Sequence, residues 1–133
     1  MEEYAGWIYI LETSSDFNRY KVGMTKSFTP MRRVNELRCG DPNLALLCAY
    51  QIPVSEFSLR DVEWELHQSL AFCPRLRFHN GNLSEWFKVD RYIIQRHVFD
   101  FLKNGFPNCL FPVFYESDFD ISSYDEWPEL NDD

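Results

Sequence analysis

The stretches "GWIYILE" (residues 6–12) and "YKVGMT" (residues 20–25) decide the fold of the amino-terminal half of the chain. Both are rich in aromatic and branched apolar residues, which favour β-strands. The residues between them, "TSSDFNR", are typical of a turn. The two stretches therefore predict an antiparallel hairpin. Its aromatic and basic residues include Tyr9, Tyr20 and Lys21.

The rest of the chain predicts three helices, one long strand and a second, short hairpin. A threonine and a proline mark the start of a helix over residues 30–38. The continuous apolar run at residues 44–53 is typical of a buried strand. Helical periodicity predicts helices over residues 57–72 and 91–104, and an Asn-Gly pair between them favours a tight turn.

Several polar residues lie beside the apolar faces of these helices. At 100° per residue, Arg33 lies about 100° from the centre of the apolar face of its helix and Arg32 about 160°, so Arg33 is nearer the sheet. On the next helix, Glu63 lies about 50° from the centre of the apolar stripe. His67 follows one turn later on the same flank. Trp64 belongs to a second apolar patch, which predicts that this helix is covered on both sides.

Charge divides the chain into two parts. The net charge of the 133 residues is −8. Residues 1–115 contain 13 acidic and 13 basic side chains, whereas residues 116–133 contain eight acidic and no basic ones. This shift predicts one folded domain over residues 1–115 and an acidic tail over residues 116–133.

Cysteine usage and hydropathy favour a cytoplasmic protein. The sequence shows no CxxC pair, no signal-peptide pattern and no apolar run long enough to cross a membrane. We therefore expect free thiols in a reducing compartment and no membrane contact, with a nuclear location if the source is eukaryotic or viral. The sequence leaves the oligomeric state open. The cysteines are Cys39, Cys48, Cys73 and Cys109.

Five motifs in a fixed order carry a family resemblance. They are "GWIYIL", "YKVGMT", "RRVNEL", "VEWELH" and "SEWFKV". Together they resemble the GIY-YIG endonuclease superfamily, and most of all its short phage- and virus-associated branch. The resemblance covers about residues 6–90. It implies an α+β fold with a small three-stranded antiparallel sheet flanked by helices, and cleavage of DNA phosphodiester bonds with one divalent metal, Mg²⁺ or Mn²⁺.

The resemblance assigns roles to four residues. Tyr9 matches the tyrosine of the first motif, Gly23 the glycine of the second, Arg33 the helix arginine and Glu63 the metal-binding glutamate. The chain departs from the pattern at the tyrosine of the second motif. Lys21 stands there, with Tyr20 one residue earlier.

The same residues suit phosphodiester hydrolysis on chemical grounds. A carboxylate such as Glu63 can hold Mg²⁺ while water supplies the other ligands. A tyrosine on a strand beside the metal, Tyr9 or Tyr20, can have its pKa lowered enough to act as general base on the attacking water. The fork of Arg33 can pair with two phosphate oxygens, and Gly23 leaves room for a phosphate backbone. Further candidates for substrate binding are Lys21, Lys26, Arg32 and His67.

Two functional hypotheses follow. The first is a metal-dependent DNA endonuclease. The second is a catalytically inactive nuclease-like fold that binds DNA or a protein partner, because a neutral body attracts a polyanion weakly. The tail over residues 116–133 interleaves aromatic residues with acids. We expect it to fold over the basic face of its own domain, to bind a basic partner or mimic DNA, or to remain a solvated tail.

Overall fold

The computed structural model describes residues 4–14, 16–107 and 113–115. Within these ranges, three helices flank a six-stranded antiparallel sheet with the strand order β4-β5-β2-β1-β3-β6. The α+β class is confirmed, but the expected three-stranded sheet is only its centre. The central strands are β1 (Tyr4–Thr13), β2 (Asp16–Thr25) and β3 (Leu44–Pro53). The added strands are β4 (Arg75–Arg77), β5 (Leu83–Lys88) and β6 (Val113–Phe114).

Strands β4 and β5 pair with each other and form the predicted second, short hairpin. Its pairing with β2, and strand β6, escape the sequence patterns because they join short, distant segments. Strand β5 pairs with β2 along Arg19, Tyr20 and Lys21, and β6 pairs with β3 at two residues only. Strand β2 also begins earlier than expected. Asp16 already pairs with Thr13 of β1, after a shift in register, so part of the predicted turn belongs to the strand.

The helices begin at residues that cap them. The side chain of Thr29 accepts a hydrogen bond at the start of α1 (Pro30–Arg38), whose bounds match the prediction. Ser58 and Asp90 do the same for α2 (Leu59–Ser69) and α3 (Arg91–Gly105). Helix α2 is therefore shorter than the predicted 57–72, because the cap at Ser58 sets its first residue.

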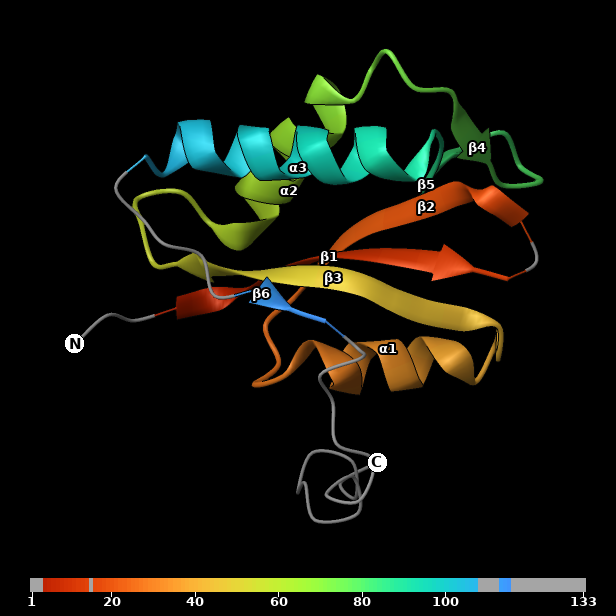
Figure 1. Ribbon diagram of the computed structural model, residues 1–133, viewed down its shortest axis with the longest axis horizontal. Coiled ribbons are helices and arrows are strands. Elements are labelled where there is room, and N and C mark those ends of the chain that lie inside the picture. The colour runs from red at the N-terminus through yellow and green to blue at the C-terminus, as the bar shows by residue number, and fades with distance from the viewer. Residues whose placement is uncertain (1–3, 15, 108–112, 116–133) are drawn as a thin grey trace.

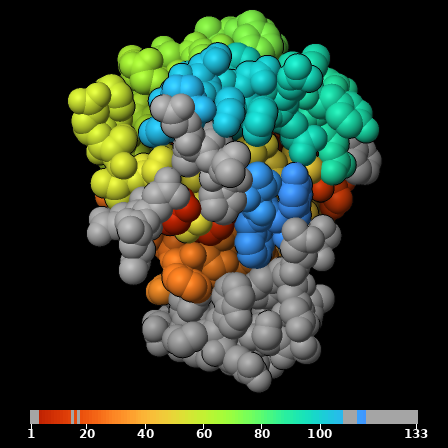
Figure 2. Space-filling model, turned by 60° about the vertical axis from the view of Figure 1, so that its left-hand side comes forward, coloured from red at the N-terminus to blue at the C-terminus, as the bar shows by residue number. Residues whose placement is uncertain are grey.

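The sheet separates two hydrophobic cores, as the layers in Figure 1 show. Helices α2 and α3 cover one face, and α1 covers the other. Figure 2 shows the same order from the side, with α2 and α3 above β6 and α1 below it. Successive residues of β1 and β2 point to opposite faces, so each of these strands contributes to both layers.

The structure describes only some of the residues to which the remaining predictions refer. Of the cysteines in the described ranges, Cys39 is exposed, Cys48 and Cys73 are buried, and all three are free. Cys109 and the acidic tail over residues 116–133 lie outside the described residues. Among the helices that the structure describes, none is long and apolar enough to cross a membrane.

Candidate active site

The candidate site lies where β2 lacks a neighbouring strand on one of its two sides. Strand β5 pairs with β2 only as far as Lys21, so the next residues of β2 have β1 on one side and α2 on the other. His67 of α2 places its Nε2 2.7 Å from the carbonyl oxygen of Val22. Glu63, one helical turn earlier, hydrogen-bonds the backbone of Met24. A helical turn of about 5.4 Å is close to two strand residues, so two side chains of α2 can continue the hydrogen bonding of the sheet.

Tyr9 of β1 lies directly opposite Gly23 of β2. The two residues are paired in the β1–β2 ladder, and the Tyr9 side chain is buried. A Cβ built on Gly23 would lie 2.5 Å from the Tyr9 hydroxyl oxygen. The glycine therefore makes room for the phenol of Tyr9. This corrects the expectation that Gly23 makes room for a phosphate backbone.

Arg33 reaches the same phenol from α1. It makes a side-chain hydrogen bond with Tyr9, and its Nη1 lies 3.6 Å from Oε2 of Glu36. Burial, reinforced by the charge of Glu85, raises the pKa of Tyr9 to about 12, and the contact with Arg33 opposes this only in part. In the metal-free protein Tyr9 is a neutral phenol at pH 7. The lowering of this pKa by a bound metal stays a prediction.

Two carboxylates meet beside Tyr9. Burial, and next the charge of Glu85, raises the pKa of Glu63 to about 7. Lys21 opposes the shift, and its Nζ lies 3.6 Å from Oε2 of Glu85. Within the described residues there is no group of three or more histidine, cysteine or acidic side chains that could hold a metal. The donor set at this edge is therefore a pair of glutamates with a lysine beside them.

The structure brings four of the predicted residues together and separates others from them. Tyr9, Gly23, Arg33 and Glu63 meet at the open edge of β2. Glu85 joins them, although it was not among the candidate residues of the sequence analysis. The sequence signal for it was its place in the fifth motif, "SEWFKV".

Tyr20 does not reach this edge. It is buried in the core on the opposite face of the sheet, opposite Phe87 of β5. Because strand residues alternate between faces, Lys21 projects toward the site and Tyr20 projects away from it. Tyr20 therefore cannot replace the tyrosine that the second motif commonly carries one residue later.

His67 has a structural position. It is buried, Nε2–H donates to the Val22 carbonyl, and Nδ1 lies 3.3 Å from Nη2 of Arg75 and accepts from it. Burial lowers the pKa of His67, which keeps the ring neutral. With both nitrogens engaged, His67 holds the strand edge and has no group left for a substrate. Of the other candidates, Lys26 is exposed just after β2, and Arg32 is half-buried on α1.

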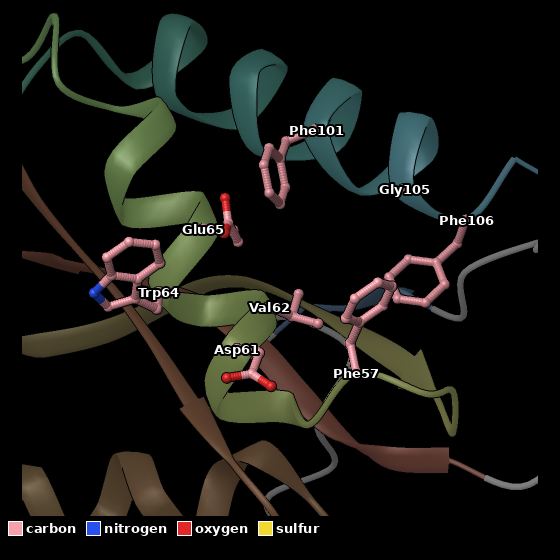
Figure 3. A pocket seen from close by; sticks show the side chains of 8 residues that line it. All are labelled: Phe57, Asp61, Val62, Trp64, Glu65, Phe101, Gly105 and Phe106. Atoms are coloured by element: carbon pink, nitrogen blue, oxygen red, sulfur yellow. The ribbon is translucent and has the colours of Figure 1, made fainter.

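An apolar pocket lies on the other flank of α2 (Figure 3). Its volume is about 610 Å³, and Asp61 and Glu65 lie among its apolar lining. Two of the lining side chains, Phe57 and Trp64, are each 58% exposed. The prediction that both sides of α2 are covered is therefore wrong for this flank. Glu63 does not line the pocket, which is thus separate from the candidate active site.

Comparison with known families identifies the chain. The sequence model of the T5orf172 domain matches residues 6–103, so the chain belongs to the T5orf172 domain family. This domain is associated with endonuclease-type proteins of the GIY-YIG and HNH-like kinds, and it indicates a nuclease-like, DNA-binding function. The resemblance to the GIY-YIG superfamily itself stays a prediction. Comparison with curated proteins and with solved structures gave no match.

Proposed function

We propose that the protein is a divalent-metal-dependent endonuclease that hydrolyses DNA phosphodiester bonds at the open edge of β2. The observation that carries this proposal is the meeting of Tyr9, Arg33 and Glu63 around Gly23. These groups come from β1, α1 and α2, on both sides of the sheet. Packing alone does not require a phenol, a guanidinium and a carboxylate at one point, whereas hydrolysis of a phosphodiester uses all three.

The carboxylates suit a hard divalent cation. The charge of Glu85 is close enough to raise the pKa of Glu63, so a cation beside Glu63 would offset an existing repulsion. Mg²⁺ accepts one or two carboxylates and keeps water as its remaining ligands. Glu63 would hold the ion, with Glu85 as a second oxygen donor. When bound, the ion would stabilise the negative charge that develops on the phosphate.

Arg33 and Tyr9 act on the same phosphate as the metal ion. The guanidinium of Arg33 can exchange its exposed partner, Glu36, for two phosphate oxygens, because a bidentate pair with a phosphate is stronger than a solvated ion pair. Tyr9, as a neutral phenol, donates a hydrogen bond that orients the phosphate or the attacking water. Lys21 occupies the position of the missing second tyrosine and contributes charge instead.

A second candidate function also has support. The pKa of Tyr9 is raised to about 12, and Lys21 stands where the GIY-YIG pattern has the tyrosine of its second motif. Both features weaken proton transfer at the site and favour a nuclease-like domain that binds DNA without cutting it. The two functions differ in one measurable respect, which is metal-dependent strand cleavage.

Nicking of supercoiled plasmid DNA decides between them. We expect wild-type protein to nick the plasmid with Mg²⁺ or Mn²⁺ and not with a chelator. Glu63→Gln should lower the rate at least about 100-fold, because it keeps the shape of the side chain and removes the charge that holds the ion. Glu65→Gln is the matched control, since Glu65 lies on the same helix but faces the apolar pocket.

The outcomes separate the two functions. Activity in wild type and Glu65→Gln but not in Glu63→Gln supports the endonuclease. Equal activity in Glu63→Gln and wild type contradicts the proposed site. No cleavage by wild type with either metal, together with retained DNA binding, supports the non-cutting domain.

A further inference from the structure

The face of the sheet around the active site is only partly covered by α1. The core beneath α1 consists of buried residues from β1, β3 and α1 itself, and Trp86 of β5 packs against it partly buried. Arg19 pairs with Lys88 across β2 and β5, and Lys21 pairs with Trp86. Paired residues of neighbouring strands point to the same face. Three basic side chains and one tryptophan therefore share this face, where Lys88 is exposed and the other three are half-buried.

Arg19 and Trp86 form a stacked pair on this surface. The guanidinium carbon of Arg19 lies 5.3 Å from the centre of the Trp86 ring, within the range of a cation–π contact. Nε of Arg19 is buried without a hydrogen-bond partner in the described structure. Arg19 has no ion pair with the described acidic residues. Arg19 is only half-buried, so part of its side chain stays open to an incoming ring.

The same surface leads directly to the active site. Arg19, Lys21 and Gly23 lie on one face of β2 at intervals of two residues. Four residues of strand cover about 13 Å at 3.3 Å per residue, so the stacked pair is a few nucleotides from the phenol of Tyr9. Lys88 is exposed beside Arg19, while Lys21 is half-buried against Glu85.

We propose that this face of β2 and β5 is a platform for single-stranded DNA. One base stacks on the guanidinium of Arg19, which Trp86 supports from beneath. Lys88 and Lys21 contact the phosphates on either side, and the strand continues toward Tyr9 and Arg33. None of the residues Arg19, Trp86 and Lys88 emerged as a site residue from the sequence. The proposal deepens the proposed function, on which its cleavage part rests.

The chemistry of the face favours an unpaired strand over a duplex. Bases within a duplex stack on each other and expose only their edges in the grooves, so a flat stacking partner has nothing to bind there. An unpaired strand exposes its base faces, which stack on aromatic rings and on arginine planes. Backbone contacts from lysines then add affinity without reading sequence.

Binding in the presence of a chelator tests the platform without relying on cleavage. The probe is a short fluorescent oligothymidylate, measured by anisotropy with the full chain at several salt concentrations. Arg19→Ala should raise the dissociation constant at least about fivefold, the lower end of the range for one stacked base. Arg96→Ala is the matched control, because it removes an exposed arginine of α3 that pairs with Asp100.

A base-free strand of the same length isolates the stacking contact. We expect wild type to bind oligothymidylate more tightly than the base-free strand, and Arg19→Ala to lose this preference. Arg19→Lys should keep the salt dependence of wild type but not the preference for bases, since lysine carries charge without a plane. Lys88→Ala should keep the preference and reduce the slope of log affinity against log salt by about 0.7.

Three results would overturn the platform. They are equal affinities of Arg19→Ala and Arg96→Ala, no preference for bases in wild type, and tighter binding to a duplex that is equally sensitive to Arg19→Ala. The cleavage assay tests the endonuclease separately. Plasmid nicking without an effect of Arg19 on binding would leave the endonuclease standing and remove the platform. Arg19-dependent binding without any nicking would leave the platform standing and remove the endonuclease.

Discussion

The two flanks of α2 have similar residues and different surroundings. One flank carries Glu63 and His67, which hydrogen-bond the backbone of β2. The other carries Asp61, Trp64 and Glu65, which border an open apolar pocket. Glu63 and Glu65 are two residues apart on one helix. Burial and a neighbouring carboxylate raise the pKa of Glu63 to about 7, whereas Glu65 is exposed.

The difference shows that position relative to a strand edge decides what a glutamate can do. A solvated carboxylate at an exposed position interacts only weakly with neighbouring charges. A carboxylate held between a strand backbone and a second carboxylate has a perturbed pKa, and added positive charge stabilises its ionised form. Three pairs of substitutions test whether the flanks differ as strongly as this comparison requires.

The largest expected effect on stability comes from His67→Ala. It removes the donor to the Val22 carbonyl and leaves a buried void, which together cost about 3 kcal/mol of unfolding free energy. Trp64→Ala on the other flank should cost at most about 1 kcal/mol, because that side chain is mostly exposed. Urea unfolding of both variants measures the difference. Equal losses would mean that His67 does not hold the strand edge.

Gly23→Ala should have the next largest effect on stability, and it should also abolish nicking. Its methyl group would fall on the Tyr9 phenol, and overpacking of this kind costs about 1–3 kcal/mol. The matched control is Gly105→Ala beside the pocket, where an added Cβ meets nothing within 4 Å. Combining Gly23→Ala with Tyr9→Ala should cost less than the sum of the two changes, because they relieve one clash. Simple additivity would contradict the contact.

The smallest expected effect is a change in the pH dependence of stability. The pKa of Glu63 is about 7 in the folded protein and 4.5 as its ordinary value, so the folded state holds the proton more tightly. Stability from this group is present below pH 4.5 and is lost as the pH rises toward 7. The lowered pKa of His67 acts in the opposite direction. The difference between wild type and Glu63→Gln therefore isolates Glu63.

Thermal unfolding in the presence of a chelator, from pH 4.5 to pH 8, measures that difference. Wild type should lose melting temperature relative to Glu63→Gln as the pH rises. Glu65→Gln should follow the wild-type curve. A parallel course of wild type and Glu63→Gln would show that Glu63 is not perturbed.

Local patterns in the sequence predicted the elements that are long and regular. The hairpin, the buried strand of residues 44–53 and the helix of residues 30–38 were recognised from periodicity and capping residues. The positions of Arg33 and Glu63 followed from helical geometry, because each lies on the flank of an apolar stripe. The family resemblance identified Tyr9 and Gly23 as partners in a site, although not why the glycine is needed.

The remaining features depend on contacts between distant segments. The Asn-Gly pair predicted the short hairpin of β4 and β5, but no local pattern marks the pairing of β5 with β2 or of β6 with β3. Arg19 and Trp86 meet because Lys21 pairs with Trp86 across two strands that lie far apart in the chain. The raised pKa of Tyr9 in the metal-free protein was not foreseen, because it requires burial to outweigh the nearby arginine. This balance between burial and charge depends on several segments, so no single segment of the sequence predicts it.

The hydrogen bonds from α2 to β2 also affect how the molecule behaves at high concentration. A strand with free backbone groups is a template on which a second chain can add a strand and begin to aggregate. His67 and Glu63 occupy a carbonyl and a backbone group along that edge. The residue proposed to hold the metal therefore also helps to keep the protein monodisperse. Substitutions at Glu63 that shorten the side chain should reduce solubility as well as activity, whereas glutamine retains the length needed to reach the strand.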